Sequence, residues 1–325
     1  MINKAWLPPD NMGQRCCSTG RLARFRSAGV SYLKGARVLG FLALVFFMGV
    51  FSVASQTGES RARIYERDNF RYLESNGLPD HDHGEFPNAH NPNRIRQQQY
   101  RFRMALSPAT RSQSIPLGRY LFGVALNGVP FDPGTAEFWN RDPRSGWRYE
   151  AMGSLDLGLD QNHAHVQPDG SYHYHALPVG LISHLREENP SGMLLLGYAA
   201  DGFSVFDDRG RADPMNRQSA LSSLRSGYRL RTGQRPGGPG GTYDGTFIED
   251  YEFISGSGDL DECNGHVGLV PGSDTPIYHY HLTGSFPFIP RCFRGEPDPS
   301  FQHRGGPPGP HPHDPRQHPP RERPR

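Results

Sequence analysis

Lysine is nearly absent from this sequence, and both of its lysines, Lys4 and Lys34, lie close to the start. A lysine Schiff base and the lysine of a phosphate-binding loop are therefore excluded from everything after Lys34. The glycine run at 235–241 is accordingly a loop and not a phosphate site. The chain also lacks a Gly-x-Ser-x-Gly string, the signature of the serine nucleophile in α/β-hydrolases.

Apolar residues are scarce too, at 35% of the chain, whereas glycine (39 residues) and proline (30 residues) are abundant. This composition argues against a helical bundle and favours a mainly β, loop-rich globule. The 325 residues are enough for one large domain. We expect a single large β domain with a few short helices, over Ser60–Arg71, Pro178–Glu188 and Ser219–Ser226.

Only one long apolar run occurs, from Val38 to Val50. Seven basic residues and one acid precede it, and Ser52–Ala54 follows with small side chains where a signal peptidase cleaves. This order is typical of a secretory signal, which we place at residues 1–54. The alternative is an uncleaved N-terminal membrane anchor, because Val38–Ala54 is at the lower length limit for a span. The sequence thus predicts a secreted or periplasmic protein with no stable membrane span after cleavage.

Removal of residues 1–54 also changes the charge of the chain. Of 35 basic and 33 acidic residues, it takes away seven and one, which leaves 28 and 32, a net charge of −4 with neutral histidines. The charge of +2 for the whole chain is therefore no argument for a nucleic-acid partner.

Cysteine is limited to four residues, of which Cys16 and Cys17 belong to the expected signal. Cys263 and Cys292 remain as an even pair in an exported chain, so we expect them to form a disulfide. Metal ligation by these two is the less favoured alternative, because they lie far apart and no Cys-x-x-Cys string is present.

One five-residue string, Ser171–His175, is repeated in its essentials about a hundred residues later at Ile277–His281. Both contain Tyr-His-Tyr-His, in which aromatic and imidazole side chains alternate with the period of a β-strand. The histidines of each copy consequently project from one face of a strand and the tyrosines from the other. Two imidazoles placed in this way can converge on one metal ion.

A further His-x-His pair, His163 and His165, precedes the first copy, and the turn signal Pro168–Gly170 separates the two pairs. This pattern predicts a hairpin that carries four histidines on one face. We expect a zinc or copper site, since all-imidazole ligation suits both metals, formed by His163, His165, His173 and His175. Asp201, at a tight Asp-Gly turn, is expected close enough to act as a ligand or to orient one.

The second copy has a matching upstream stretch, in which His266-Val267 corresponds to His165-Val166. Asn264 stands where His163 stands, so the candidate ligands are His266, His279 and His281. We therefore expect a second site that is weaker or only structural. The non-metal alternative for both copies is a ladder of histidines and tyrosines that stabilises the sheet.

The two Tyr-His-Tyr-His strings resemble the signature of the YHYH-domain proteins. Four further segments also resemble blocks of that family: Gly128–Phe131, Ala200–Phe203, Gly241–Phe247 and Phe286–Arg291. The resemblance runs from about His81 to Phe301 and implies an exported domain of this family, without a particular activity. The complete second string departs from longer relatives, in which the second copy often lacks its histidines.

We accordingly divide the chain into a signal (1–54), a lead-in segment (55–78), a YHYH domain (79–296) and a disordered tail (297–325). The tail is rich in proline, histidine and arginine and has scarcely any apolar residue, so it cannot bury a core.

The residues favour an exported protein that binds zinc or copper through His-x-His strand pairs, with hydrolytic and redox roles both open. The carboxylates near both copies support a second interpretation, a carbohydrate-binding or carbohydrate-active wall-associated protein with a glycan partner. A structural surface module is the third. Metal content separates the first from the others, and glycan retention separates the second from the third.

The exported protein should begin at Ser55, because Ser52–Ala54 fits the cleavage rule. N-terminal sequencing of protein recovered from the export compartment tests this prediction. A mature chain that begins before Val38 would contradict it.

Overall fold

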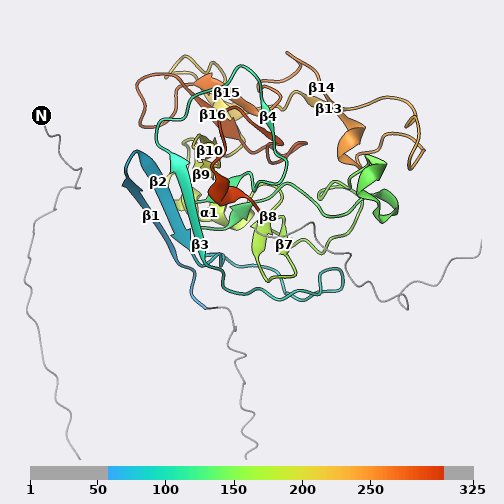
Figure 1. The fold of residues 1–325 in the computed structure, drawn as a ribbon. Coiled ribbons are helices and arrows are strands. Elements are labelled where there is room, and N and C mark those ends of the chain that lie inside the picture. Colours follow the sequence, from blue (N-terminus) through green and yellow to red (C-terminus); the bar gives the residue numbers. More distant parts are fainter. Residues whose placement is uncertain (1–57, 304–325) are drawn as a thin grey trace, which may run out of the picture. The chain divides into compact units, whose positions relative to one another are not determined.

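A computed structural model describes residues 58–303; the expected signal at 1–54 and most of the expected tail lie outside the described residues. The described part is one mainly β domain around an eight-stranded sheet of order β15-β16-β10-β9-β5-β6-β8-β7 (Figure 1). Its strands are short and cover Gly123–Ala125 (β5), Pro130–Phe131 (β6), Ala164–Val166 (β7), Tyr172–Tyr174 (β8), Leu195–Ala199 (β9), Ser204–Phe206 (β10), Gly265–Gly268 (β15) and Ile277–His281 (β16). The expectation of a single loop-rich β domain is confirmed.

Two similar halves make up this sheet. Each half has an inner hairpin, β5–β6 or β9–β10, and an outer hairpin, β7–β8 or β15–β16. The second strand of each outer hairpin pairs in parallel with the second strand of the inner hairpin, β8 with β6 and β16 with β10. The halves meet where β5 and β9 pair antiparallel, with Gly123 opposite Ala199 and Ala125 opposite Gly197. This register is unchanged when the halves are exchanged, so a pseudo-two-fold axis passes through the pairing.

Glycine permits the close contact at this axis. A Cβ on Gly123 would lie 2.4 Å from the carbonyl oxygen of Tyr198, and one on Gly197 would lie 2.1 Å from that of Val124. Both distances are far inside van der Waals contact, so a larger residue would push the central strands apart. Glycine is therefore required at the equivalent position of both halves.

The inner hairpins turn on equivalent dipeptides, Asn127-Gly128 in the first half and Asp201-Gly202 in the second. Both glycines have a positive φ, of 83° and 96°, which glycine adopts without strain. In both turns the side-chain oxygen accepts the backbone N–H two residues on, at 3.2 Å and 3.4 Å. Residues 123–132 consequently align with 197–206 without a gap, an internal repeat that extends beyond the histidine strings.

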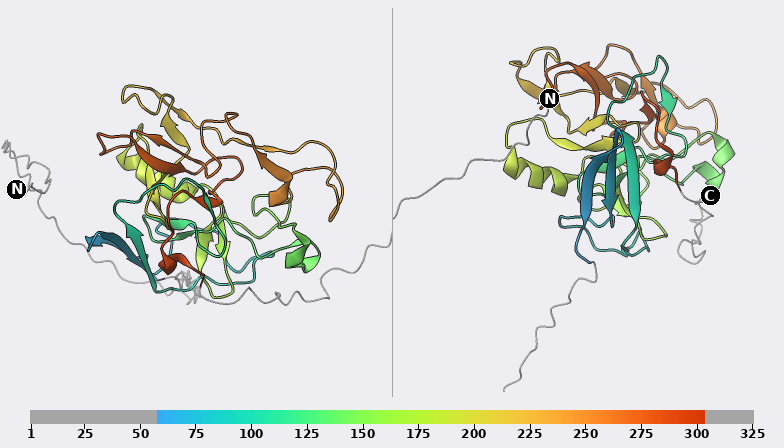
Figure 2. Two further views of the ribbon diagram at one scale, coloured as in Figure 1. Left: turned by 45° about the horizontal axis from the view of Figure 1, so that its top comes forward. Right: turned by 60° about the vertical axis from the view of Figure 1, so that its left-hand side comes forward.

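A separate three-stranded sheet is formed by Ala62–Arg67 (β1), Phe70–Ser75 (β2) and Tyr100–Ala105 (β3), and Figure 2 shows it outside the eight-stranded sheet. The expected helix at Ser60–Arg71 is therefore wrong. Cross-strand contacts favour the hairpin, since the rings of Tyr65 and Tyr72 stack at 5.2 Å.

Within residues 58–303, α1 (Val179–Glu188) is the one α-helix, where a helix was expected at Pro178–Glu188. The expected helix at Ser219–Ser226 is wrong, because β12 (Leu221–Ser223) pairs there with β11 (Arg209–Arg211). The remaining strands are Ile115–Pro116 (β4), Tyr228–Leu230 (β13), Tyr251–Phe253 (β14) and Cys292–Phe293 (β17). Single 3-10 turns cover Trp139–Arg141 (η1), Pro143–Ser145 (η2), Ile248–Asp250 (η3) and Pro299–Phe301 (η4).

The core extends into both flanking segments of the expected domain. Leu73, in the expected lead-in, and Phe301, in the expected tail, are both fully buried. The Phe301 ring stacks on Phe102 with centroids 4.4 Å apart. The core therefore continues beyond residues 79 and 297, because single apolar side chains in polar segments pack into it.

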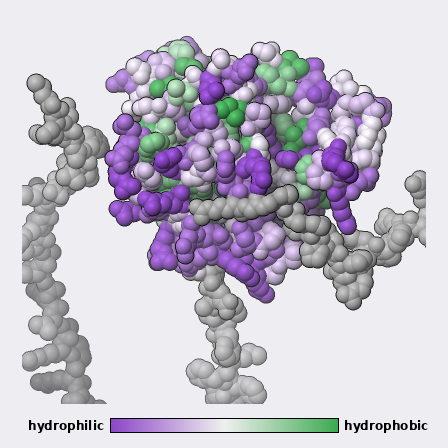
Figure 3. Space-filling view, viewed as in Figure 1, coloured by the Kyte–Doolittle hydropathy of each residue, from purple (hydrophilic) through white to green (hydrophobic). Residues whose placement is uncertain are grey.

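The face in Figure 3 is largely hydrophilic, with small separate apolar patches. No helix in residues 58–303 has the length and apolar character needed to cross a membrane.

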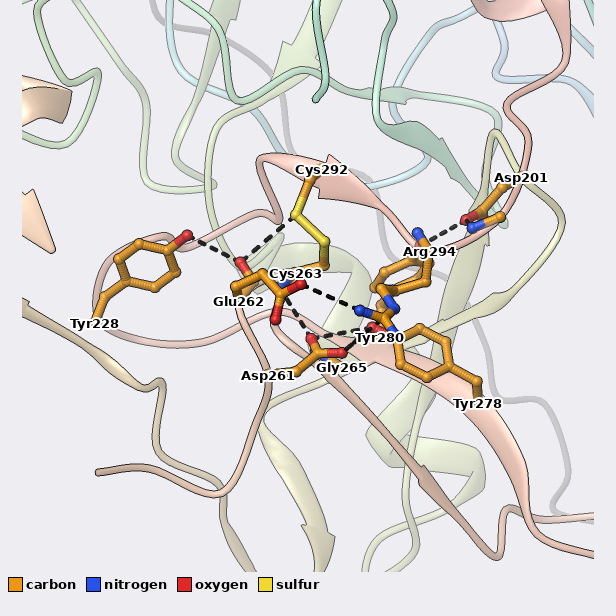
Figure 4. The surroundings of a disulfide bond; sticks show 11 residues. Asp201, Tyr228, Asp261, Glu262, Cys263, Gly265, Tyr278, Tyr280, Cys292 and Arg294 are labelled. Carbon is orange, nitrogen blue, oxygen red and sulfur yellow. Dashed lines mark hydrogen bonds and ion pairs between the residues drawn. A yellow bond between two sulfur atoms is a disulfide. The ribbon is translucent and has the colours of Figure 1, made fainter. Parts of the chain in front are cut away.

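Cys263 and Cys292 form the expected disulfide, with Cα atoms 5.1 Å apart (Figure 4). The bond joins the loop before β15 to β17. Next to it, the backbone carbonyl of Glu262 accepts the hydroxyl of Tyr228 at 2.9 Å, and the Glu262 carboxylate pairs with Arg294 at 3.1 Å. The disulfide thus holds the outer hairpin of the second half in place.

Replacing both cysteines with serine should lower the free energy of unfolding by about 3–4 kcal/mol, because the bond joins residues separated by 29 positions. Urea unfolding of the mature protein measures this loss. Thiol labelling of the unfolded, unreduced wild type should find neither cysteine free, and two labelled thiols would refute the bond.

Candidate metal centres

Three histidines of the first outer hairpin bring their ring nitrogens together. β7 and β8 place His165 directly opposite His173, and His175 follows on the same face of β8. The Nε2 atom of His175 lies 3.0 Å from that of His173 and 3.1 Å from that of His165. The expected hairpin and its Pro168–Gly170 turn are present, with a positive φ at Gly170. We call these three residues the first triad.

The second outer hairpin carries an equivalent set. His266 lies opposite His279, and their Nε2 atoms are 3.1 Å apart. His281 follows on the same face and completes the second triad. In each triad the three candidate ligand atoms lie within 4.8 Å of one another. The triads occupy corresponding places at opposite edges of the sheet.

His163, expected as a fourth ligand, does not join the first triad. It lies before β7 with a positive φ of 55°, outside the strand alternation, and its Nδ1 donates to the Leu177 carbonyl at 2.8 Å. Asn264 has the same conformation, with a φ of 56°. The carbonyls of His163 and Asn264 accept equivalent backbone bonds, from His175 at 2.8 Å and from His281 at 3.0 Å. Asparagine favours left-handed backbone, so Asn264 is not a lost ligand.

Asp201 does not reach the first triad either. It lies on the tyrosine face of the second half, where its Oδ2 accepts the Tyr280 hydroxyl at 2.5 Å and the Gly295 N–H at 2.9 Å (Figure 4). Burial raises the pKa of Asp201. Its equivalent in the first half, Asn127, donates to the Tyr174 hydroxyl at 2.9 Å. Asp201 follows the first copy in sequence, but the pseudo-symmetry of the sheet assigns it to the second.

The other two tyrosines are held by a matching pair of aspartates. Tyr172 donates to Asp160 at 2.7 Å, and Tyr278 donates to Asp261 at 3.0 Å. Both carboxylates also accept backbone N–H groups of the loop that leads into the hairpin. The tyrosine face is thus anchored by buried hydrogen bonds, which leaves the opposite face to the histidines.

Backbone carbonyls fix the tautomer of most triad rings. A carbonyl oxygen only accepts, so a ring nitrogen that bonds to it must carry the proton. Four Nδ1 atoms bond to carbonyls at 2.6–3.3 Å: those of His165, His173, His279 and His281. Their Nε2 atoms therefore hold lone pairs that face the middle of each triad. Such carbonyl bonds are typical of histidines that bind metals.

The second triad has lone pairs without donors at its centre. The Nε2 atom of His281 is buried with no hydrogen-bond partner. The ring of His266 donates outward to the Asp259 carbonyl, and its Nε2 faces that of His279. Converging lone pairs repel unless a cation lies between them. Nitrogen ligands at about 2.0–2.1 Å from a tetrahedral zinc ion lie about 3.3 Å apart, close to the observed separations, so the residues fit a metal.

Burial keeps five of the six triad imidazoles neutral. It lowers the pKa of His266, lowers that of His279 to about 4, and lowers those of His173, His175 and His281 well below the ordinary value. Neighbouring imidazoles lower the pKa further in four of these five rings, all but His266. Neutral imidazole is the form that binds metal, so the triads are ready for a cation at neutral pH.

A family model described as YHYH protein matches residues 101–295. The chain belongs to the YHYH protein family. The matched region contains both triads and both Tyr-His-Tyr-His strings, as the sequence resemblance implies. Neither a search of curated proteins nor one of solved structures found a match. The triads are the chemically distinctive feature of this YHYH protein.

Sequence reasoning finds all six triad histidines and places Asp160 and Asp261 among the carboxylates near the two copies, but it does not predict that these two bind the tyrosine hydroxyls. Asp160 and Asp261 each stand five positions before the first histidine of a triad, a spacing that could have identified them as a pair. His81 accepts the Tyr174 hydroxyl at 2.6 Å and comes from a distant loop. No local pattern points to His81, because its partner is 93 positions away.

Metal-free protein should lose stability as the pH falls from about 6.5 towards 4. The folded state keeps five triad rings neutral, with a pKa of about 4 for His279, whereas the unfolded chain takes up protons near the ordinary histidine pKa of about 6.5. Above pH 6.5 the rings are neutral in both the folded and the unfolded state, so their contribution to the free energy of unfolding is fully present. Below pH 6.5 protons bind to the unfolded chain and stabilise it relative to the folded state. For His279 the loss is roughly 3 kcal/mol. Denaturant unfolding across this pH range measures it.

Two variants sharpen this measurement. His279→Ala should have a shallower pH dependence, because one buried imidazole is gone. His90→Ala, which removes a side chain that is 55% exposed, should keep the wild-type dependence. A metal-free wild type whose stability stays constant over this range would be inconsistent with neutral buried triads.

Proposed function

We propose that this YHYH protein is exported and binds a transition metal, zinc or copper, at its histidine triads. The observation that carries the proposal is the set of buried Nε2 lone pairs that converge in the second triad, where His281 Nε2 has no hydrogen-bond partner. The equivalent arrangement in the first triad supports the same chemistry there. The expected signal at 1–54 supports a secreted or periplasmic location, where both metals are used.

Three imidazoles leave a coordination position open for water or another ligand in tetrahedral geometry. His165 and His266 are the partly exposed members of their triads, so each site has a side towards solvent. Zinc in such a site supplies an activated water for hydrolysis, and copper supplies redox chemistry. The chain's own contribution is a set of imidazole rings, four of which have their outward Nδ1 fixed by a backbone carbonyl.

The carbohydrate alternative has less support. Asp160, Asp201 and Asp261, three of the carboxylates that flank the histidine strings, are bonded to tyrosine hydroxyls and backbone N–H groups. They are therefore engaged in the fold and are poorly placed to flank a glycosidic bond. A purely structural ladder remains the alternative that metal analysis must separate.

The second triad has three histidines, as the first does, so it is no longer expected to bind metal more weakly. The expectation of a weaker second site rests on Asn264 in place of His163, and His163 is not at the first triad. We therefore propose one metal ion at each triad.

Untagged mature protein from the export compartment should contain up to two zinc or copper ions per chain by elemental analysis. His173→Ala with His175→Ala should remove one, and His279→Ala with His281→Ala should remove the other. Metal should raise the melting temperature of each double variant less than that of the wild type, because only one site remains.

His163→Asn is the matched control. It places at position 163 the residue that occupies the equivalent left-handed position in the second half, and it should leave the metal content unchanged. Two outcomes would show that the histidine strands serve structure alone. The first is wild-type protein that never holds metal, and the second is metal retained by a variant that lacks the histidines of the first and the second triad.

A further inference from the structure

The two triads differ at one equivalent neighbouring position. In the parallel pairing of inner and outer hairpins, Phe131 pairs with Tyr174 in the first half and Val205 pairs with Tyr280 in the second. The same residues pair with the first glycine of each inner hairpin. The next residue along the chain is therefore Asp132 in the first half and Phe206 in the second.

Phe206 covers the second triad with an apolar ring. It is 3% exposed, pairs with His281, and lies with its ring centroid 5.4 Å from that of His279 and 6.0 Å from that of His281. Two nearby carboxylates are neutralised by other partners. That of Asp207 pairs with Arg186, and that of Asp259 pairs with Arg225 at 3.3 Å.

Asp132 brings a carboxylate to the corresponding place in the first half. The Phe131 ring lies on the tyrosine face, 6.0 Å from the ring of Tyr174, so strand alternation directs the next residue to the histidine face. The Asp132 N–H donates to the Tyr174 carbonyl at 3.0 Å, which continues the pairing.

The carboxylate of Asp132 is 6% exposed and lies 3.5 Å from the ring of His303. The charge of His303 in turn lowers the pKa of His173, which agrees with the place that strand alternation gives Asp132. Arg291 also lies in this neighbourhood, but it is paired with Glu150 at 2.6 Å. Burial raises the pKa of Asp132, and the charges of His303 and Arg291 lower it. Asp132 is thus a buried carboxylate next to the first triad whose ion-pair partner is His303, and no arginine pairs with it directly.

This difference matters because the cost of burying a cation rises with the square of its charge. A dication bound by three neutral imidazoles costs about four times as much to desolvate as a monovalent ion of the same size. A buried carboxylate offsets one of the two charges, and a phenyl ring offsets none. Imidazole binds zinc and both oxidation states of copper, so the surrounding charge selects between them.

We propose, building on the metal-binding function above, that the first triad is selective for a divalent cation and the second for monovalent copper. Asp132 acts through charge beside the ligands and is a specificity-determining residue. Phe206 acts by keeping the side of the second site next to His279 and His281 apolar.

The test uses two variants of the mature protein that retain one triad each. The first-triad protein carries His279→Ala and His281→Ala, and the second-triad protein carries His173→Ala and His175→Ala. Each is titrated with zinc alone and, under reducing anaerobic conditions, with monovalent copper alone. The first-triad protein should bind zinc at least about tenfold more tightly than the second-triad protein, and the order should reverse for monovalent copper.

Asp132→Asn is close in shape to the wild type and isolates the charge. In the first-triad protein it should weaken zinc binding by about 10–100-fold and change the affinity for monovalent copper much less. Asp201→Asn, which alters a buried carboxylate on the tyrosine face, is the matched control and should leave zinc affinity unchanged.

Equal zinc affinities at the two triads, together with no effect of Asp132→Asn, would overturn the selectivity and leave the proposed metal-binding function intact. Binding of neither metal by either single-triad protein would overturn both. A weakening of zinc binding by Asp201→Asn as large as that by Asp132→Asn would show a loss of folding rather than of local charge, and would also overturn the role assigned to Asp132.

Discussion

The pairing of β5 with β9 is the contact on which the rest of the structure depends. Gly123 and Gly197 allow the two strands to approach at a register that looks the same from either half. Each inner hairpin then offers one free strand to an outer hairpin, so the two triads arise at equivalent edges. A shift of this register by one residue would turn one half over and move its histidines to the tyrosine side.

Tyrosine and histidine alternate strictly along the outer strands, so the two faces of the sheet have different roles. Tyrosines point to one side, where Asp160 and Asp261 or the turn residues Asn127 and Asp201 hold their hydroxyls. Histidines point to the other side, where backbone carbonyls bind Nδ1 of four of the six rings and leave their Nε2 directed inward. The tyrosine hydrogen bonds thus hold the strands rigidly, and the rigid strands hold the imidazoles in a geometry that suits a cation.

Much of this arrangement follows from the sequence. The alternation in Tyr-His-Tyr-His predicts the strands and their faces, and Pro168–Gly170 predicts the hairpin. The error at His163 has a physical cause, because a His-x-His spacing predicts a shared face only while the strand continues. The strand ends before His163, and the asparagine at the equivalent position 264 is the one visible sign of the left-handed conformation.

The remaining misjudgements concern long-range contacts. The pairing of Asp201 with Tyr280 spans 79 positions and depends on the pseudo-symmetry, which is hidden by low identity between 123–132 and 197–206. The same is true of Leu73 and Phe301, whose burial depends on partners far away in the chain. Polar composition around a single apolar residue gives no sign of where that residue packs.

The symmetric register of the central strands has a further meaning. A contact in which each side presents the same residues to the other is isologous, the type of interface found in two-fold homodimers. The eight-stranded sheet therefore has the form of such a dimer with its two subunits joined in one chain. A homodimer must carry two identical sites, whereas a joined chain is free to place an aspartate at 132 and a phenylalanine at 206 within a single molecule.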